Sequence, residues 1–474
     1  MLRPYQKRSL PPLGEVRPKA GKGEVAARIS FSAGVLQLPP PPLRGPPPPR
    51  GEESAAALHR RLDRTSTAPL IVAFSGGGDS LALLIAAKAW ADGAGRRLIA
   101  VSVDHRLQPA GADWAAWCQA RCRRLGVEHR TLVWAGAKPT TGLAAAARAA
   151  RHGLIAEAAR DAGAEVILMG HTADDRLEAR LMREAGASCA EPREWAPAPR
   201  WPEGRGLFIL RPLIAARRAR IREALAAAGE TWIEDPANGD PRSARARARA
   251  ALAGGGEPGP LEGPPLGAAL LAHVVEGPAG DLTVARAALA EATPAAARAL
   301  IGAALLCAAG TDRPPRGLSL DRLMARIASD ARFVATLAGA RLEAAGPFIR
   351  ILREVGEVGR PGGALSPLAE GVPQVWDGRF EIEAHTAGLA IAPLAGRAAK
   401  LTRVQRNALK AIPAAARPCL PAVIDEVGAV TCPTVAPGLR VTVRSLVFAR
   451  LAAALGAVNR EAAIGRMAKT LATT

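Results

Sequence analysis

A glycine-rich hexapeptide between two apolar segments constrains this chain more than any other feature. It reads Ser75-Gly-Gly-Gly-Asp-Ser80, follows the apolar run Pro69–Phe74 and precedes the apolar segment Leu81–Trp90. The first run is typical of a buried strand and the second of a helix. Glycines let backbone N–H groups approach an anion, and the N-terminus of a helix attracts negative charge. The sequence therefore predicts a strand, a phosphate-binding turn and a helix start.

The polar side chains of the hexapeptide suit a nucleotide with a metal ion. Ser75 and Ser80 can donate hydroxyl hydrogen bonds to phosphate, whereas Asp79 would repel it. Asp79 is better explained as a ligand of Mg²⁺ held against the phosphates. The alternative is a simple glycine turn with a Ser/Asp helix cap. Three consecutive glycines between a buried strand and a helix favour the binding loop over that alternative.

The hexapeptide resembles the PP-loop of the N-type ATP pyrophosphatases. The resemblance implies that ATP is cleaved between its α- and β-phosphates, with AMP and pyrophosphate as products and an adenylylated intermediate. It also implies that the nucleotide is bound by the residues of the loop, which are Ser75, Gly76, Gly77, Gly78, Asp79 and Ser80.

Further motifs narrow the family. They are Asp104-His105-Arg106-Leu107-Gln108, Arg148-Ala-Ala-Arg151-His152, His171-Thr-Ala-Asp-Asp175-Arg-Leu-Glu178, Leu210-Arg-Pro-Leu213, and Trp232-Ile-Glu-Asp-Pro-Ala-Asn-Gly-Asp240 with Arg245 and Arg249. Together with the PP-loop they resemble, in order and residue type, the motifs of the bacterial tRNA(Ile)-lysidine synthases. The chain departs from that pattern at Gln108, His152 and Ala179, where the family usually has Arg, Tyr and Thr.

The resemblance implies a carbon–nitrogen ligase that uses ATP and Mg²⁺. Members of the family join free L-lysine to the wobble cytidine of tRNA(Ile) with a CAU anticodon. ATP first activates the cytosine oxygen as an adenylate, and lysine then displaces AMP. The implied partners are therefore this tRNA and free L-lysine, in the cytoplasm.

Roles for single residues follow from their expected places in the fold. Asp104 and His105 end the predicted strand Arg97–Val103, and ligands of a doubly wound sheet lie at the carboxyl ends of its strands, so both are expected to meet the nucleotide. If residues 174–183 are helical, His171, Asp175 and Glu178 share one face at the N-terminal end of that helix.

Each of these residues also has a chemical role to fill. Glu178 is expected to hold the lysine ammonium, and Asp175 to assist Mg²⁺ or orient the amine. A carboxylate or His171 must take a proton from the amine before it can attack. Arg211 is expected to stabilise charge on the phosphates. For Asp175 and Glu178 the alternative is an acidic first turn of a helix, which helices favour in any case. For Arg211 the alternative is an ordinary surface arginine.

The charge of the chain favours an RNA partner. Lys and Arg number 63 against 43 Asp and Glu, which gives a formal net charge of +20 at pH 7. The residues expected to contact tRNA are Arg148, Arg151, Arg245 and Arg249. Two arginine clusters are interpreted as phosphate contacts, namely Arg211, Arg217, Arg218, Arg220 and Arg222, and then Arg242, Arg245, Arg247 and Arg249. Codon bias of a GC-rich genome is the competing explanation for the arginine excess. Aromatic residues make up only 3% of the chain, which argues against an extended base-stacking platform.

Two other functions stay open at this point. One is another PP-loop tRNA-modifying enzyme, such as a 2-thiocytidine synthase. The chain has 6 cysteines but no C-x-x-C pair for an iron–sulfur cluster, which counts against thiolation. The other is a noncatalytic tRNA-binding protein on a PP-loop scaffold. The retained Asp79, Asp175 and Glu178 argue against that loss of catalysis.

Composition divides the chain into five parts. We expect a Pro-rich, disordered tail over 1–55 and a PP-loop catalytic domain over 56–250, with a doubly wound, mostly parallel sheet as in α/β folds. A Gly/Pro-rich linker follows over 251–280. A helical accessory domain is expected over 281–360, with helices at 282–309 and 318–332 and a short sheet after them, and the family resemblance implies that it binds tRNA. A second accessory domain is expected over 361–474, with a strand-rich part that begins at 376–382.

The sequence says little about the protein's surroundings. It contains no membrane-spanning run of ~18 apolar residues, and its few scattered cysteines fit a reducing cytoplasm. The oligomeric state stays open, a homodimer being one option.

Overall fold

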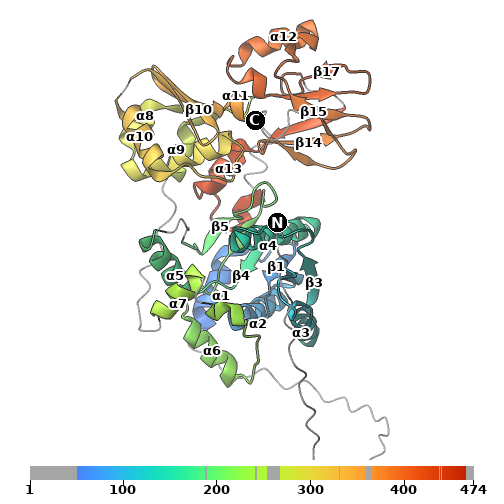
Figure 1. Ribbon diagram of the computed structural model, residues 1–474, viewed down its shortest axis with the longest axis vertical. Helices are drawn as coiled ribbons and strands as arrows, with labels where there is room; N and C mark the ends of the chain where they lie inside the picture. The colour runs from blue at the N-terminus through green and yellow to red at the C-terminus, as the bar shows by residue number, and fades with distance from the viewer. Residues whose placement is uncertain are drawn as a thin grey trace, which may run out of the picture. The chain divides into compact units, whose positions relative to one another are not determined.

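The computed structural model describes residues 51–186, 189, 191–240, 243–252, 267–329, 331–358, 365–436, 438 and 440–465 (Figure 1). Most of the predicted tail and residues 253–266 of the predicted linker lie outside these ranges. The predicted end of the tail at residue 55 is wrong, because helix α1 (Gly51–Arg61) begins earlier. This helix buries Ala57 and Leu58, which gives it a stabilising contact that an unstructured tail would lack.

The first sheet has the strand order β3-β2-β1-β4-β6-β5 among the described residues. Its parallel strands are β1 (Leu70–Ala73), β2 (Leu98–Asp104), β3 (Glu128–Val133), β4 (Val166–Met169) and β6 (Phe208–Leu210). The edge strand β5 (Trp195–Pro197) is antiparallel to β6. Order and direction confirm the expected doubly wound, mostly parallel sheet.

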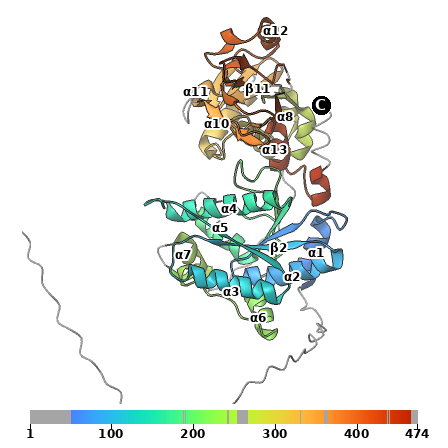
Figure 2. The same ribbon diagram turned by 90° about the vertical axis from the view of Figure 1, so that its right-hand side faces the viewer.

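Alternating apolar residues of the central strands feed two cores, one on each face of this sheet. Val72 and Leu168 pack with α2 (Gly78–Ala94), α3 (Gly111–Arg124) and α6 (Arg218–Ala227). Ile71 and Ile167 pack instead with α4 (Leu143–Asp161). Figure 2 shows α4 on one side of the sheet and α2 and α3 on the other. The remaining helices of this part are α5 (Ala173–Glu184) and α7 (Ala244–Ala251).

The next part of the chain combines helices with an antiparallel sheet of order β7-β8-β11-β10-β9. Its elements are η3 (Ala268–His273), β7 (Val274–Glu276), β8 (Leu282–Ala285), α8 (Arg286–Glu291), α9 (Pro294–Ala308), α10 (Gly317–Ala328), β9 (Phe333–Leu337), β10 (Ala340–Ala345), β11 (Phe348–Arg353) and α11 (Val355–Val358). The predicted short sheet is confirmed by the β9–β10–β11 pairing.

Two expectations for this part are wrong. Residues 268–276, expected in the linker, form η3 and β7. The helix expected from Leu282 starts as a strand, because β8 alternates buried and half-buried residues and pairs with both β7 and β11. A separate helix, α9, begins at Pro294, where the Thr293 hydroxyl accepts a hydrogen bond from the Ala296 N–H.

The last part contains two small sheets, of order β12-β15-β16-β17 and β13-β14-β18. Its elements are β12 (Ser366–Pro367), β13 (Gln374–Trp376), β14 (Phe380–Ala384), β15 (Ala390–Pro393), η4 (Ala398–Lys400), α12 (Arg403–Ala408), η5 (Leu409–Ala411), η6 (Arg417–Cys419), β16 (Pro421–Ile424), β17 (Val430–Thr431), β18 (Val441–Ser445), α13 (Val447–Ala454) and η7 (Glu461–Ala463). The expected strand-rich part that begins at 376–382 is confirmed, and within that segment Asp377 and Gly378 adopt positive φ angles and turn the chain between β13 and β14.

The C-terminal residues return to earlier parts of the chain. Leu451 of α13 packs in the core of α9 and β11, and Val458 and Ile464 pack in the core of the first sheet. In the part of the chain that the structure describes, no helix is both long and apolar enough to cross a membrane.

Candidate nucleotide-binding and catalytic site

The PP-loop is held in a shape that only glycine permits. Gly76 has a φ of +81°, and a Cβ at this residue would overlap the side chain of Ile233. The backbone N–H of Ile233 donates to the Gly76 carbonyl at 2.9 Å, so the Trp232-Ile233 segment closes over the loop. A Cβ on Gly170, at the end of β4, would lie 3.0 Å from the Asp79 carbonyl oxygen. Both glycines therefore allow a close backbone approach at the start of α2.

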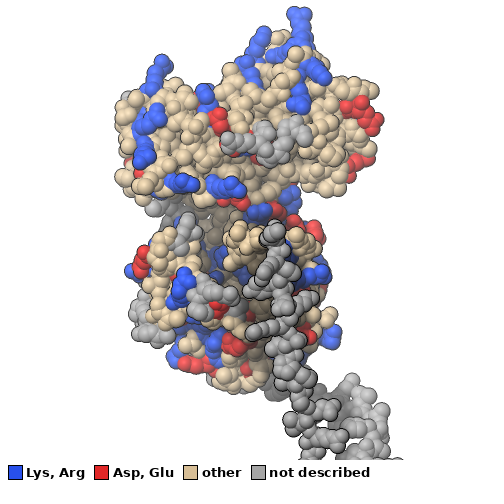
Figure 3. All heavy atoms as spheres, viewed as in Figure 1, with Lys and Arg blue, Asp and Glu red and all other residues tan. Residues whose placement is uncertain are grey.

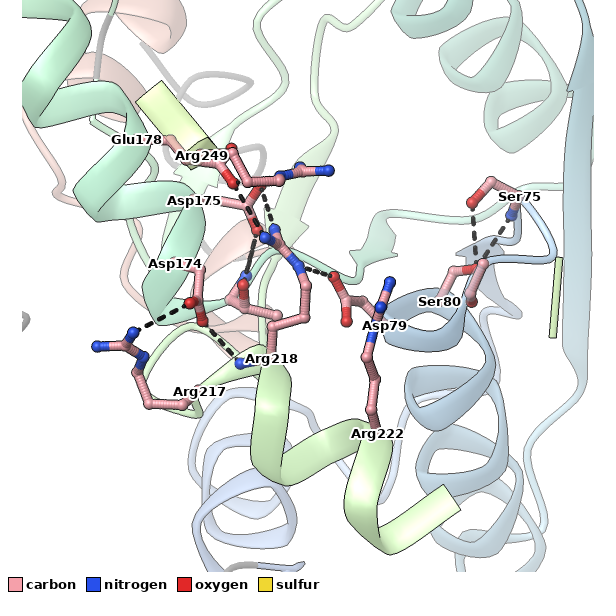
Figure 4. A network of polar contacts seen from close by, with 12 residues as sticks. Ser75, Asp79, Ser80, Asp174, Asp175, Glu178, Arg217, Arg218, Arg222 and Arg249 are labelled. Carbon is pink, nitrogen blue, oxygen red and sulfur yellow. Dashed lines mark hydrogen bonds and ion pairs between the residues drawn. The ribbon is translucent and has the colours of Figure 1, made fainter. Parts of the chain in front are cut away.

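The two serines of the loop have different surroundings (Figure 4). The buried Ser80 hydroxyl donates to the Gly77 carbonyl at 2.9 Å and accepts from the Ser75 N–H at 3.2 Å. Ser75 is exposed, and its hydroxyl lies 3.2 Å from that of Ser80. Ser80 thus shapes the loop, while the Ser75 hydroxyl stays accessible to a ligand.

Acidic and basic side chains interlock beside the loop in what we call the carboxylate–arginine cluster. Its members among the described residues are Asp79, Asp175, Glu178, Arg218, Arg245 and Arg249. Glu178 accepts from Arg218 Nη1 and Arg249 Nε, each at 2.9 Å, and from Arg245 Nε at 2.7 Å. The Glu178 residue is fully buried. A lysine ammonium can therefore reach Glu178 only if a guanidinium leaves it, and the expected lysine role stays a prediction.

Asp175 has a structural contact as well as a place in the cluster. Helix α5 confirms the expected helix over 174–183. Asp175 Oδ2 accepts from the Thr172 backbone N–H at 2.7 Å and the Thr172 hydroxyl at 2.9 Å, which forms a capping box. Its Oδ1 faces Arg218 and Arg245. The cap thus fixes the carboxylate that the sequence placed near the reacting amine.

Electrostatics differ between the carboxylates of the cluster. Burial raises the pKa of Asp79 above its ordinary value, although Arg218 opposes that shift. Burial alone would also raise the pKa of Glu178, but hydrogen bonds from Arg249 and Arg245 lower it below the ordinary value. Glu178 is therefore a stable anion in this arrangement, held by its three guanidinium partners.

His171 and Arg211 lie together at the carboxyl ends of the neighbouring strands β4 and β6. Burial, followed by the charge of Arg211, holds the pKa of His171 well below its usual range. Arg211 Nε donates to His171 Nδ1 at 3.0 Å, and Arg211 Nη1 donates to the Arg193 carbonyl at 2.7 Å. The His171 ring is therefore neutral, with Nδ1 accepting from Arg211 and the proton on Nε2, and the predicted role of His171 as a proton acceptor stays a prediction.

Asp104 and His105 lie at the carboxyl end of β2, as expected. Asp104 Oδ1 accepts from the backbone N–H of Arg106 at 2.8 Å. His105 packs edge-on against Trp134, with ring centroids 5.9 Å apart. Burial, followed by the charge of Arg151, lowers the pKa of His105. Its Nδ1 is buried and has no hydrogen-bond partner among the described residues, so it is free for a ligand.

These elements enclose a cavity of about 550 Å³, a size typical of small-molecule sites. Most of the predicted site residues line it, namely Ser75, Gly77, Gly78, Asp79, Ser80, Asp104, His105, Arg151, His171, Asp175, Arg245 and Arg249. Predicted residues that do not line it are Gly76, Arg148, Glu178 and Arg211. Arg148 has an exposed surface, although burial of its guanidinium lowers its pKa; burial lowers the pKa of Arg151 to about 10 and that of Arg211 to about 10.

Several residues that line the cavity were not assigned to catalysis or to nucleotide binding from the sequence. The most important is Arg218, and others are Trp114, Arg222, Glu234 and Asp235. Arg218 and Arg222 lie one turn apart at the start of α6, which brings both to one face of that helix. That spacing was visible in the sequence, but the carboxylates that Arg218 pairs with were not.

The donor set fits one Mg²⁺ ion that shares its ligands with a nucleotide. No group of three or more His, Cys, Asp and Glu side chains within the described ranges is arranged to hold a metal alone. Asp79 Oδ1 is buried and has no partner among the described residues. Magnesium is commonly bound by one or two carboxylates together with substrate phosphates and water. A single unpaired carboxylate oxygen beside a phosphate-binding loop matches that requirement.

Comparison with known proteins agrees with this geometry. A family model described as "PP-loop domain" matches residues 51–254. The tRNA(Ile)-lysidine synthase of Caulobacter vibrioides is 48% identical over 414 residues, which cover 85% of this chain and 97% of that protein. The enzyme of the same name from Hyphomonas neptunium is 37% identical over 327 residues, covering 65% of this chain and 87% of that protein. This chain therefore belongs to the tRNA(Ile)-lysidine synthase family.

Proposed function

We propose that this protein is an ATP-dependent ligase that joins free L-lysine to the wobble cytidine of tRNA(Ile) with a CAU anticodon. The products are lysidine in the tRNA, AMP and pyrophosphate. The observation that carries the proposal is the cavity itself. It combines a glycine loop suited to phosphates with a cluster of both charge signs suited to an amino acid. With these substrates, we expect the protein to act in the cytoplasm.

ATP binds with its phosphates at the PP-loop. The backbone N–H groups at the start of α2 and the Ser75 hydroxyl donate to phosphate oxygens. Asp79 would hold Mg²⁺ through Oδ1, which is unpartnered among the described residues, and the bound ion would neutralise charge on the phosphates. The cytosine oxygen attacks the α-phosphorus and pyrophosphate leaves. The Arg211 guanidinium, buried beside His171, supports this step by adding positive charge to the site.

Lysine then displaces AMP from the activated cytidine. Its amine attacks the ring carbon, the bond between that carbon and the AMP oxygen breaks so that AMP leaves, and a carboxylate of the carboxylate–arginine cluster takes up the proton that the nitrogen loses. Lysine carries two ammonium groups and one carboxylate, so it can exchange partners with a cluster that holds both charge signs. We assign the ammonium group that does not react to Glu178. Arg245 or Arg249 then moves from Glu178 to the lysine carboxylate or to phosphate.

We also propose that the regions expected over 281–360 and 361–474 grip the tRNA. Figure 3 shows Lys and Arg side chains, in blue, over this part of the surface. Around α12 the described chain has no Asp or Glu between residues 384 and 424. Exposed cations of that segment are Lys400, Arg403, Arg406 and Lys410. A run of exposed positive charge without acidic neighbours suits the phosphates of an RNA.

Replacing Asp79 tests the nucleotide role. Asp79→Asn keeps the shape of the side chain but weakens its hold on Mg²⁺, so we expect product formation to fall by at least about 100-fold. The control is Asp92→Asn, which changes a largely exposed carboxylate on the same helix. Near-normal activity of Asp79→Asn would contradict the proposed role. Release of ADP and phosphate, in place of AMP and pyrophosphate, would contradict adenylylation.

A further inference from the structure

Arg218 is held rigidly at the point where α6 meets α5. It is the first residue of α6, and its backbone N–H donates to Asp174 Oδ2 at 2.7 Å. The neighbouring Arg217 side chain pairs with the other oxygen of Asp174 at 3.3 Å. The Arg218 side chain is only 14% exposed. Both ends of this residue are therefore fixed by contacts.

The Arg218 guanidinium contacts carboxylates from two separate elements (Figure 4). Its Nε donates to Asp79 Oδ2 at 2.9 Å, and Asp79 belongs to α2. Its Nη1 donates to Glu178 Oε1 at 2.9 Å, and its Nη2 lies 3.4 Å from Asp175 Oδ1, both on α5. A planar fork with fixed donor directions can make these contacts together, whereas a single ammonium cannot.

Charge compensation alone does not explain this arrangement. Asp175 and Glu178 already pair with Arg245, and Glu178 also pairs with Arg249. Within the described residues, by contrast, Arg218 is the one cation that bonds to Asp79. The contact uses Asp79 Oδ2 and leaves Oδ1 buried and unpartnered. Arg218 thus selects which oxygen of Asp79 is left for another ligand.

We propose that Arg218 is a positioning residue that fixes the Asp79 carboxylate so that its Oδ1 faces Mg²⁺. The same guanidinium links Asp79 to Asp175 and Glu178, the carboxylates assigned to the lysine amine. This inference rests on the proposed function, in which Asp79 binds the metal of an ATP complex. Groups that orient a metal ligand from outside the first coordination shell commonly change metal affinity by about 10- to 100-fold. Loss of the fork should therefore weaken metal-dependent nucleotide binding.

The test is Arg218→Lys, which keeps the charge and removes the fork. We would titrate Mg²⁺ and measure binding of α,β-methylene ATP by calorimetry, without tRNA or lysine. The half-saturating Mg²⁺ concentration should rise by about 10-fold or more, while binding without Mg²⁺ should change little. Arg220→Lys is the control, because Arg220 lies on the same helix, is exposed and pairs only with Glu223 among the described residues. Its titration should match that of the wild type.

A second variant guards against misfolding of the first. Asp174→Asn weakens the contact that holds the backbone of Arg218 and leaves the cluster itself unchanged. It should raise the half-saturating Mg²⁺ concentration in the same direction, with a smaller effect. A wild-type Mg²⁺ titration by Arg218→Lys would overturn the positioning role even if the wild type makes lysidine. If the wild type binds the nucleotide without any Mg²⁺ dependence, the metal role of Asp79 and this inference both fail.

Discussion

A buried ion pair ties the C-terminal segment to the PP-loop part of the chain. Arg96 Nη2 lies 2.8 Å from Glu461 Oε1, and Arg96 Nη1 lies 2.8 Å from Glu461 Oε2. Each side chain is only 2% exposed. Glu461 Oε2 also accepts from the Asp63 backbone N–H at 2.8 Å. We therefore expect Glu461→Ala to destabilise the protein strongly.

The magnitude follows from what the substitution leaves behind. The Arg96 guanidinium would stay buried without its anion, and removing one partner of a buried pair costs about 3–5 kcal/mol. The Asp63 N–H would lose its acceptor as well, which adds to the cost by about 1 kcal/mol. By comparison, Glu223→Ala breaks a pair whose side chains are 63% and 64% exposed, and its loss should cost about 0–1 kcal/mol.

Urea unfolding followed by tryptophan fluorescence measures this difference. Trp195 reports on the contact between the C-terminal segment and the first sheet. Its indole N–H donates to the Val458 carbonyl at 2.9 Å, and its ring packs with Val458 in the core of that sheet. The midpoint for Glu461→Ala should fall well below those of the wild type and of Glu223→Ala. Added salt should narrow that gap little, since buried charges are poorly screened. Equal midpoints for the two variants would refute this reasoning.

Three further predictions concern the cavity and the surface. Gly76→Ala should abolish ATP binding in a folded protein, because its φ is +81° and its Cβ would overlap Ile233; calorimetry would show normal affinity if this is wrong. Substituting alanine for the exposed cations around α12 should flatten the salt dependence of tRNA binding by roughly 2–4 units, whereas alanine at the ion-paired Arg245 and Arg249 should flatten it by less than about 2. If filter binding shows the same change in salt dependence for the α12 variants and for the Arg245 and Arg249 variants, the proposed tRNA surface around α12 is contradicted. Burial raises the pKa of Cys118 to about 11, so iodoacetamide at pH 8 should label it only after unfolding; rapid labelling of the native protein, seen by peptide mass analysis, would count against that environment.

The sequence predicted the elements whose signals are local. An apolar run, three glycines and an apolar helix sufficed for β1, the PP-loop and the start of α2. Most of the predicted binding residues line the cavity because they follow strands at their carboxyl ends, where a doubly wound sheet gathers its ligands. By contrast, β8 was missed because four strand residues stand before an Ala-rich segment that suits a helix. The Asp377-Gly378 turn was visible as a hairpin signal and was overlooked.

Long-range partners could not be predicted. Arg218 meets Asp79 across 139 residues of chain, and Arg96 meets Glu461 across 365. No local pattern specifies such pairs, because they depend on how α6 and η7 pack against the first sheet. The same reason explains why Glu178 was expected to be free for lysine. Its three guanidinium partners come from the separate helices α6 and α7.

The proposed reaction is tested by the mass of the tRNA product. Purified protein would be incubated with ATP, free L-lysine and tRNA(Ile) with a CAU anticodon, and the digested tRNA would be analysed by mass spectrometry. The wobble nucleoside should gain the mass of lysine less one water, with one AMP and one pyrophosphate released for each lysine incorporated. Omission of lysine should prevent that gain. Incorporation of sulfur, or an unmodified cytidine while tRNA still binds, would contradict the lysidine reaction.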